Sequence, residues 1–298
     1  MRALGSERTE GIVVLLVRFG EIALKSRFVR RQLRDRLVAN IQDMFAAEGV
    51  ECITGADEAR IYVHADDLER ARSLLTRVFG VVSVSPAAEG HADLETLRKL
   101  ALDEATRALS PGASFAVRAR RVGTHPFTSM DLAKDIGGAI VDANPGVRVD
   151  LTHPRVEIHV EVRENRGFVF REVWPGPGGL PLGSQGRALA IVEDEAGMVA
   201  AWMGMKRGCR VVVAAPVDSK DVDPLRRWDV HLKVLAGGDP AQLDEILRIA
   251  RADALFVGTR GKDFHPEARP KVPVPVFEPV VGLCDEEIAA LAARIRSA

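Results

Sequence analysis

The second half of the chain alternates short, continuous apolar runs with helical segments. The runs ALAIV, CRVVVAA, VHLKVLA, DALFVG and VPVPVF lie at 188–192, 209–215, 230–236, 253–258 and 272–277, and helices are expected at 196–207, 240–251 and 285–297. A strand without polar alternation needs cover on both faces, which parallel sheets with helices on either side provide. Residues 187–298 therefore predict a Rossmann-like α/β domain.

The first part of the chain predicts the order βαββαβ, which is the ferredoxin-like plan. A helix over 27–45 follows a β-rich run at 12–19, and its apolar face repeats at Val29, Leu33, Leu37, Ile41 and Phe45. Short strands at 50–54 and 59–65, a helix over 66–79 and a strand at 81–86 complete the order. We assign this domain to residues 1–85.

A second small α/β module is expected over residues 86–174. Helices are predicted at 92–110 and 128–143, and strands at 114–121, 147–151, 155–162 and 167–173. The stretch WPGPGGLPLGSQG, 174–186, is dense in Gly and Pro, and 175–186 is interpreted as a linker rather than an element. Its glycines could bring backbone amides to a substrate, but a plain hinge explains them equally well.

Composition limits the partners of the chain. The net charge is −1, so any nucleic-acid affinity must come from local basic surface. The three cysteines form no C-x-x-C pair, which argues against a disulfide framework or a zinc knuckle. Residues 1–11 lack the apolar core of a signal peptide, and the apolar run GIVVLLV is too short to span a bilayer. These features predict a cytoplasmic protein without a membrane partner.

Two basic stretches are candidate RNA-binding surfaces. The first lies at or just ahead of the first helix and comprises Lys25, Arg27, Arg30, Arg31 and Arg34. The second comprises Arg118, Arg120 and Arg121 at the end of a strand, Thr128 and Ser129 at a helix start, and Lys134 further along that helix. Arginines and free helix N–H groups both bind phosphates. The alternatives are a solvated helix face for the first stretch and a protective basic sheet edge for the second.

The turn after the first apolar run of the second half carries Glu193, Asp194 and Glu195, with Gly197 following. A phosphate cradle is expected there in a nucleotide-binding fold, but a triphosphate would meet like charge. Carboxylates at a helix N-terminus stabilise the helix by about 0.3–1 kcal/mol each, so we interpret the turn as self-capping. A Mg²⁺ site is the less favoured alternative, and no metal site is predicted.

One cysteine is a candidate for thiol chemistry. Cys52, Cys209 and Cys284 are expected to be small buried side chains. Cys284 precedes the last predicted helix, whose N-terminus would lower the thiol pKa, so it is the best candidate for a reactive thiolate.

Several stretches, taken in order, resemble the tRNA 4-thiouridine synthase family, also called the thiamine-biosynthesis sulfurtransferase family. RFGEIALKSRFVRRQL resembles its ferredoxin-like opening, and FAVRARRVGTHPFTSMDLAKDIGGAI with VDLTHPRVEIHVEVRENRGFVF resembles its THUMP domain. GPGGLPLGSQGRALAIV, MVAAWMGMKRGC and PVFEPVVGLCDEEI resemble its PP-loop domain. The resemblance implies tRNA binding through the THUMP domain, a role in tRNA modification and a homodimer.

The chain also departs from that family. The adenylating loop Ser-Gly-Gly-x-Asp-Ser is replaced by EDEAGM, and FVGTRGKDFHPEA stands where a longer nucleotide segment is expected. The segment with the family's catalytic cysteine and a rhodanese domain are expected to be missing. We therefore predict a tRNA-binding protein with a degenerate PP-loop domain and no cofactor, acting alone or with a separate catalytic or sulfur-donor protein.

Two other functions stay open at this point. The chain could be an active ATP-dependent tRNA sulfurtransferase with Mg²⁺ on the acidic turn and sulfur carried by Cys284 or Cys209. It could also be a nucleotide sensor or structural subunit whose basic stretches are only solvated faces.

Overall fold

The computed structural model describes residues 13–20, 26–217, 219–237 and 242–298. Residues 1–11, for which no signal peptide was predicted, and Lys25 therefore lie outside the described residues. The chain divides into two compact units. Of the described residues, one unit holds Val13–Leu16, Tyr62–His64 and Ser85–Val173, and the other holds those within Val17–Ile61, Ala65–Val84 and Trp174–Ala298.

The N-terminal part has the predicted ferredoxin-like order. It comprises β1 (Val13–Phe19), α1 (Arg27–Ala47), β2 (Ile53–Ala56), β3 (Ile61–His64), α2 (Leu68–Leu75) and β4 (Val81–His91), with the strand order β2-β3-β1-β4. Ser26 and Asp67 cap the two helices through side-chain oxygens that accept backbone N–H groups. The apolar face of α1 is buried from Leu33 onward, whereas Val29 is 37% exposed. The prediction was wrong for Val29, because burial begins only after the first turn.

The middle of the chain places two helices beside a sheet, as predicted. Its elements are α3 (Leu94–Ala108), β5 (Ser114–Val122), α4 (Ser129–Ala143), β6 (Arg148–Val149), β7 (Val156–Arg163) and β8 (Arg166–Phe170). Strand β5 pairs in parallel with β6 and β7, and β8 runs antiparallel to β7 and β4. The inward side chains of β5 and β7, including Phe115 and Val160, pack with Leu97 of α3 and Ile136 of α4 in one core.

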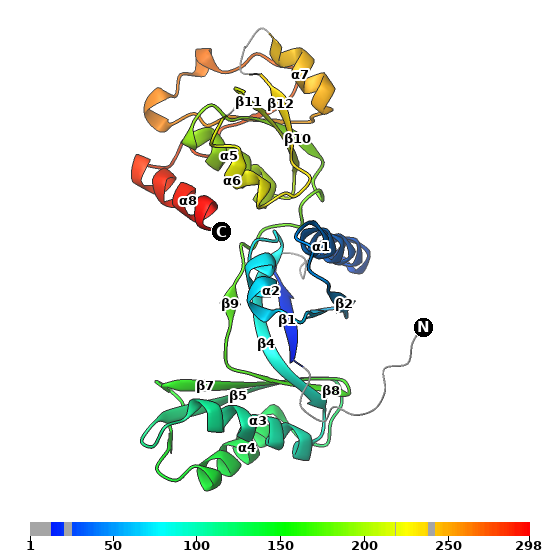
Figure 1. The fold of residues 1–298 in the computed structure, drawn as a ribbon, viewed down its shortest axis with the longest axis vertical. Coiled ribbons are helices and arrows are strands. Elements are labelled where there is room, and N and C mark those ends of the chain that lie inside the picture. The colour runs from blue at the N-terminus through cyan, green and yellow to red at the C-terminus, as the bar shows by residue number, and fades with distance from the viewer. Residues whose placement is uncertain (1–12, 21–25, 218, 238–241) are drawn as a thin grey trace. The chain divides into compact units, whose positions relative to one another are not determined.

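The C-terminal domain is the predicted parallel α/β sheet (Figure 1). Its strands are β10 (Arg187–Ile191), β11 (Arg210–Ala215), β12 (Lys233–Ala236), β13 (Leu255–Phe256) and β14 (Val276–Phe277), and its helices are α5 (Glu195–Lys206), α6 (Asp223–Arg226), α7 (Leu243–Ala250) and α8 (Asp285–Ser297). The strand order is β12-β11-β10-β13-β14, with every pairing parallel. Alternate residues of β10 and β11 face the two sides: Val213 packs with α5 and α8, and Leu189 packs with α7. Both faces are covered, which explains the unbroken apolar strands.

The Gly/Pro-dense stretch is more ordered than a linker. Trp174 and Pro175 form β9 (Trp174–Pro175), which pairs antiparallel with β4, so the interpretation as a linker without an element was wrong there. Beyond β9, the N–H of Gly178 donates to Val81 O at 2.8 Å and that of Leu180 donates to Lys206 O at 3.0 Å. A two-residue strand has no periodicity that a sequence pattern can reveal.

Candidate functional sites

The crevice expected to hold a ligand in this sheet lies where the strand order reverses. In open parallel sheets, ligands bind outside the carboxyl ends of the strands at this switch point. Here β10 begins the domain, and the chain moves from it to β11 on one side and later to β13 on the other. The acidic turn follows β10, and Gly258 to Arg260 follow β13. These two loops therefore meet at the position where a nucleotide phosphate would be sought.

Asp194 is tied down on both of its carboxylate oxygens. It is the N-cap residue of α5, and its Oδ1 accepts the N–H of Gly197 at 2.9 Å. Its Oδ2 accepts a hydrogen bond from Nη1 of Arg260, whose Nε lies 3.3 Å from Asp285. The hydrogen bond to Asp194 is the main reason why the pKa of Arg260 is raised. An aspartate and an arginine of this chain thus neutralise each other at the switch point.

The other two carboxylates of the turn behave differently. Glu195 accepts a 2.6 Å hydrogen bond from Arg296, which also donates to Asp221 at 3.0 Å. Glu193 is exposed and makes no hydrogen bond or ion pair with any described residue. Among the residues that the structure describes, no three His, Cys, Asp or Glu side chains converge as metal ligands. Asp194 and Glu195 thus bond to separate arginines rather than converging on a common point, and Glu193 bonds to no described cation.

Close backbone packing also fills the switch point. A Cβ at Gly258 would lie 2.3 Å from the N of Gly197, and one at Gly197 would lie 2.6 Å from the O of Ile191. Both approaches require glycine, since no real Cβ makes such contacts. The loop after β13 therefore lies directly on the first turn of α5, where a phosphate would need room.

In the THUMP-like module, the three strand arginines have different surroundings. Arg118 donates through Nε to Glu157 at 2.8 Å and through Nη2 to Leu151 O at 3.0 Å. Arg121 donates to Gly123 O at 2.8 Å. Arg120 is exposed, and within the described part of the chain it has no hydrogen-bond or ion-pair partner. Arg118 and Arg120 share one face of β5 because side chains alternate along a strand.

The start of α4 is not as open to phosphate as expected. Thr128 and Asp131 form a capping box, in which Asp131 N donates to Thr128 Oγ1 at 3.2 Å and Thr128 N donates to Asp131 Oδ2 at 2.9 Å. The hydrogen bonds from Thr128 lower the pKa of Asp131. The carboxylate of Asp131 thus accepts the hydrogen bonds that Thr128 could have donated to a phosphate. Ser129 is half-buried, and Lys134 is exposed.

The arginines of α1 range from exposed to nearly buried. The side chain of Arg27 is 91% exposed beside Glu58, and that of Arg31 is 77% exposed beside Asp35. Arg34 is only 19% exposed and donates to both Asp35 and Asp57 O. Arg27, Arg30, Arg31 and Arg34 line one surface hollow together with Phe28 and Glu58. Phe28 was missed by the sequence reasoning, which considered charge alone.

The cysteines do not form a reactive pair. Cys52 and Cys209 precede β2 and β11, and burial raises the pKa of both thiols. Cys284 is exposed and caps α8, whereas Cys52 and Cys209 are half-buried. The expectation of three buried cysteines was therefore wrong, because all three lie at the ends of elements and not inside them. The backbone hydrogen bond at Glu287 favours the Cys284 thiolate, but the hydrogen bond to Glu286, desolvation and the Glu287 carboxylate outweigh it and raise the pKa. The expected lowering of the Cys284 pKa was therefore wrong, because two carboxylates lie beside the helix N-terminus.

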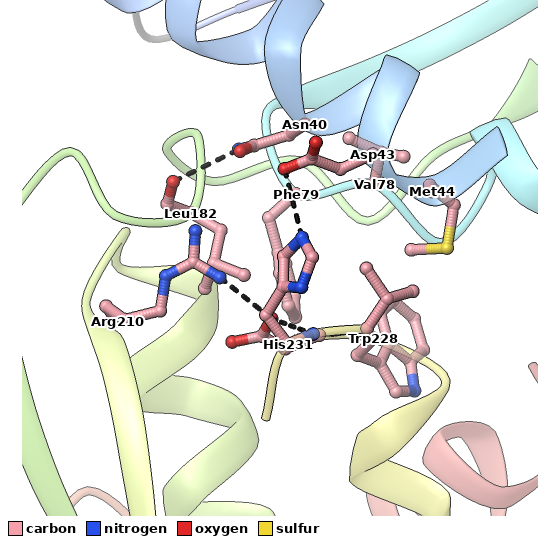
Figure 2. A pocket seen from close by; sticks show the side chains of 11 residues that line it. Asn40, Asp43, Met44, Val78, Phe79, Leu182, Arg210, Trp228 and His231 are labelled. Atoms are coloured by element: carbon pink, nitrogen blue, oxygen red, sulfur yellow. Dashed lines mark hydrogen bonds and ion pairs between the residues drawn. The ribbon is translucent and has the colours of Figure 1, made fainter. Parts of the chain in front are cut away.

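A small pocket between α1 and the C-terminal domain is lined by several charged side chains, of which Asp229 is buried (Figure 2). The side chain of Asp229 is 1% exposed, and its Oδ1 accepts from Arg210 at 2.8 Å and from His231 N at 3.0 Å. Burial raises the pKa of Asp229, against the charge of Arg210. His231 also pairs with Asp43 of α1 at 3.3 Å, and Asn40 donates to Leu182 O at 3.1 Å.

The cations that hold the acidic turn, Arg260 and Arg296, were not among the predicted site residues. Arg260 and Arg296 lie 66 and 101 residues from their carboxylate partners. Their only sequence signal is that Arg260 belongs to FVGTRGKDFHPEA, the stretch that departs from the nucleotide segment. No described helix has the length and apolar character that a membrane span requires.

Comparisons with known proteins agree with this architecture. Residues 14–85 match the ThiI ferredoxin-like domain and residues 91–171 match the THUMP domain. The PH1313 protein of Pyrococcus horikoshii Ot3 has a crystal structure with TM-score 0.82 and 29% identity, over 95% of this chain and 99% of that one. A 4-thiouridine synthetase crystallised with RNA and ATP shares the fold, with TM-score 0.74 and 19% identity over 95% of this chain and 85% of that one. The chain is thus a THUMP protein with a ferredoxin-like N-terminal domain.

Curated relatives identify the family. A probable tRNA sulfurtransferase of Methanothermobacter thermautotrophicus is 37% identical over 67% of this chain and 51% of its own length. The tRNA sulfurtransferase of Pyrobaculum aerophilum is 40% identical over 67% of this chain and 41% of its own length. The chain belongs to the tRNA sulfurtransferase family through its ferredoxin-like and THUMP domains. It spans about half the length of the curated relatives it matches.

Proposed function

We propose that the chain binds tRNA in the cytoplasm and takes part in tRNA modification, and that the turn after β10 does not hold the phosphates of ATP. The observation that carries the first part is the match of two successive domains to tRNA sulfurtransferases. Exposed arginines in each of these domains support it, because an RNA phosphate can contact only cations that lie on the accessible surface.

The second part rests on the contacts of Asp194. A helix N-terminus binds anions through its free N–H groups and its dipole. Here Asp194 already accepts the N–H of Gly197, and Arg260 neutralises it. A triphosphate would have to displace this carboxylate and also the Gly258 loop, which lies against Gly197. We therefore propose that the PP-loop site is degenerate and that a separate protein supplies adenylation and sulfur.

The first test measures tRNA binding and AMP formation in the same samples. The protein is titrated with unmodified tRNA by fluorescence anisotropy between about 50 and 200 mM salt, where each phosphate contact adds about 0.9 to the slope of log affinity against log salt. AMP release from α-labelled ATP is followed with tRNA and a persulfide donor, and compared with a sample that lacks tRNA. We expect salt-dependent binding without AMP.

Other outcomes would contradict the proposal separately. AMP formation that depends on tRNA would show a working nucleotide site and make the chain an active sulfurtransferase. Absence of binding at low salt would overturn the tRNA-binding role and favour a structural subunit. The homodimer implied by the resemblance belongs to the same proposal, and light scattering with and without tRNA measures it as molar mass.

A further inference from the structure

An exposed aromatic ring stands among the arginines at the start of α1. Phe28 is 71% exposed, compared with 37% for Phe264 and 49% for Phe277. It lines the same surface hollow as Arg27, Arg30, Arg31, Arg34 and Glu58. This hollow, which we call the Phe28 hollow, lies in the first two turns of the helix.

Folding does not require a ring at this position. The buried face of α1 follows Leu33, Leu37 and Ile41, spaced four residues apart, and Phe28 is out of phase with that row. A single exposed apolar side chain is ordinary on a protein surface. Its surroundings are unusual, because four guanidinium groups and one carboxylate line the same hollow.

The cations beside the ring are available for exchange. Arg27 pairs with Glu58 at 3.2 Å and Arg31 pairs with Asp35 at 3.7 Å, and both arginine side chains are more than three-quarters exposed. Such surface ion pairs contribute little, so a phosphate can replace the carboxylate. Arg34 is different, since its hydrogen bonds to Asp35 and to Asp57 O hold its side chain in place at the side of the hollow.

We propose that the Phe28 hollow is a subsite for an unpaired nucleotide, with the base stacked on Phe28 and its flanking phosphates on Arg27 and Arg31. Aromatic rings and guanidinium planes are the usual stacking partners of splayed bases in RNA recognition. The bases of a duplex are not accessible in this way, so the ligand is a single-stranded end, loop or bulge. This inference rests on the proposed function and adds to it the kind of RNA segment that α1 contacts.

Substitutions at Phe28 separate stacking from charge. We expect Phe28→Ala and Phe28→Leu to weaken tRNA binding about tenfold, since stacking contributes about 1–3 kcal/mol per base. Phe28→Trp retains a ring and is expected to keep the affinity. None of these changes alters the salt slope, whereas Arg31→Ala lowers it by about 0.7–0.9. Phe264→Ala, which removes another partly exposed ring, is the matched control and is expected to bind as wild type.

Fluorescence of the Phe28→Trp variant reports stacking directly. The native residues Trp174, Trp202 and Trp228 are 6%, 2% and 3% exposed, so the new indole would be the accessible one. We expect quenching by a short unstructured oligoribonucleotide, and none by the abasic version of the same oligonucleotide or by an acidic peptide. Equal quenching by the abasic oligonucleotide or the peptide would show an anion site without base stacking.

The outcomes distinguish this inference from the proposed function. If wild-type protein binds tRNA and Phe28→Ala binds equally well, the subsite is wrong while tRNA binding stands. If Phe28→Ala also loses affinity for a blunt-ended RNA duplex of two separate strands, which has no unpaired nucleotide, the ring does not read an unpaired nucleotide. If wild-type protein binds no tRNA, both the proposed function and the subsite are wrong.

Discussion

Neighbouring carboxylates in the turn after β10 have different roles, although the sequence presents them as one acidic run. Asp194 is the N-cap of α5 and bonds to Arg260, Glu195 bonds to Arg296, and Glu193 is exposed. Their roles follow from helix geometry, because only the N-cap side chain reaches the free N–H groups of the first turn. Asp194 is therefore the residue of the acidic turn that caps α5.

Replacing Asp194 tests its capping role. We expect Asp194→Ala to lower the free energy of unfolding by about 1 kcal/mol, the usual cost of losing an N-cap. Thermal unfolding measures the difference. Glu193→Ala removes a carboxylate of the same turn without a contact and is expected to change stability by less than about 0.5 kcal/mol. Equal losses in the two variants would contradict the assignment.

Asp229 makes a prediction about pH. Burial raises the pKa of this carboxyl in the folded state, so the folded protein binds its proton more tightly than the unfolded chain. Stability from this group therefore falls as pH rises from about 3.9, its ordinary value, through the raised value. We expect the unfolding free energy of wild type minus that of Asp229→Asn to decrease with rising pH across this window. Denaturant titrations at several pH values measure it, and an increase would contradict the prediction.

At the scale of the element, β5 separates a structural arginine from a free one. Arg118 bonds to Glu157 and Leu151 O, whereas Arg120, on the same face, has no partner among the described residues. The strand was predicted from its alternating pattern, but a pattern of charges does not show which arginine neighbouring strands will engage. This distinction comes from folded contacts, with Glu157 of the neighbouring strand β7 and with Leu151 O in the segment after β6.

The two arginines are therefore expected to respond differently to substitution. Arg120→Ala should weaken tRNA binding and lower the salt slope by about 0.9, the contribution of one phosphate contact, while leaving the melting temperature unchanged. Arg118→Ala should lower the melting temperature, because it removes the hydrogen bonds of Arg118 to Glu157 and to Leu151 O. Anisotropy titrations and thermal unfolding on the same preparations give both quantities. Loss of affinity for Arg118→Ala alone would reverse the assignment.

Elements were predicted where a period or an unbroken apolar run was present. The strands of the C-terminal sheet and the helix α1 follow this rule. The misses have physical causes: β9 is too short to show a period, and Val29 lies in a helical turn that the core does not cover. In the candidate sites, Arg260, Arg296 and the neighbours of Cys284 act through folded contacts, which local sequence does not display.

At the scale of the whole molecule, helices α1 and α2 belong to the same compact unit as the C-terminal sheet. Phe79, which follows α2, is 1% exposed and packs against Trp228 with ring centroids 5.2 Å apart and against Trp202 with centroids 5.6 Å apart. Residues from separate predicted domains thus share one aromatic cluster. The C-terminal sheet is therefore connected to α1 and α2 by more than the 12 residues interpreted as a linker. Asn40 of α1 also donates to Leu182 O, and Asp43 of α1 pairs with His231.

Removal of the Phe79 ring tests this connection. We expect Phe79→Ala to cost about 3–5 kcal/mol, as for other large core aromatics. The loss should appear in the denaturant midpoint measured by tryptophan fluorescence, because Trp202 and Trp228 lie on the other side of the cluster. Phe28→Ala, which removes a ring that is 71% exposed, is the control, with an expected change below about 0.5 kcal/mol. An unchanged tryptophan midpoint in Phe79→Ala would show that the two parts unfold separately.

The capped turn after β10 has a consequence for the energetics of the C-terminal domain. A protein that binds a soluble anion gains stability as the ligand concentration rises, and loses it on dilution. Asp194 is covalently attached, so the anion at the start of α5 has an effective concentration that dilution does not change. Under the proposed loss of the nucleotide site, the folding free energy of this domain is expected to be the same at high and at low ATP concentration.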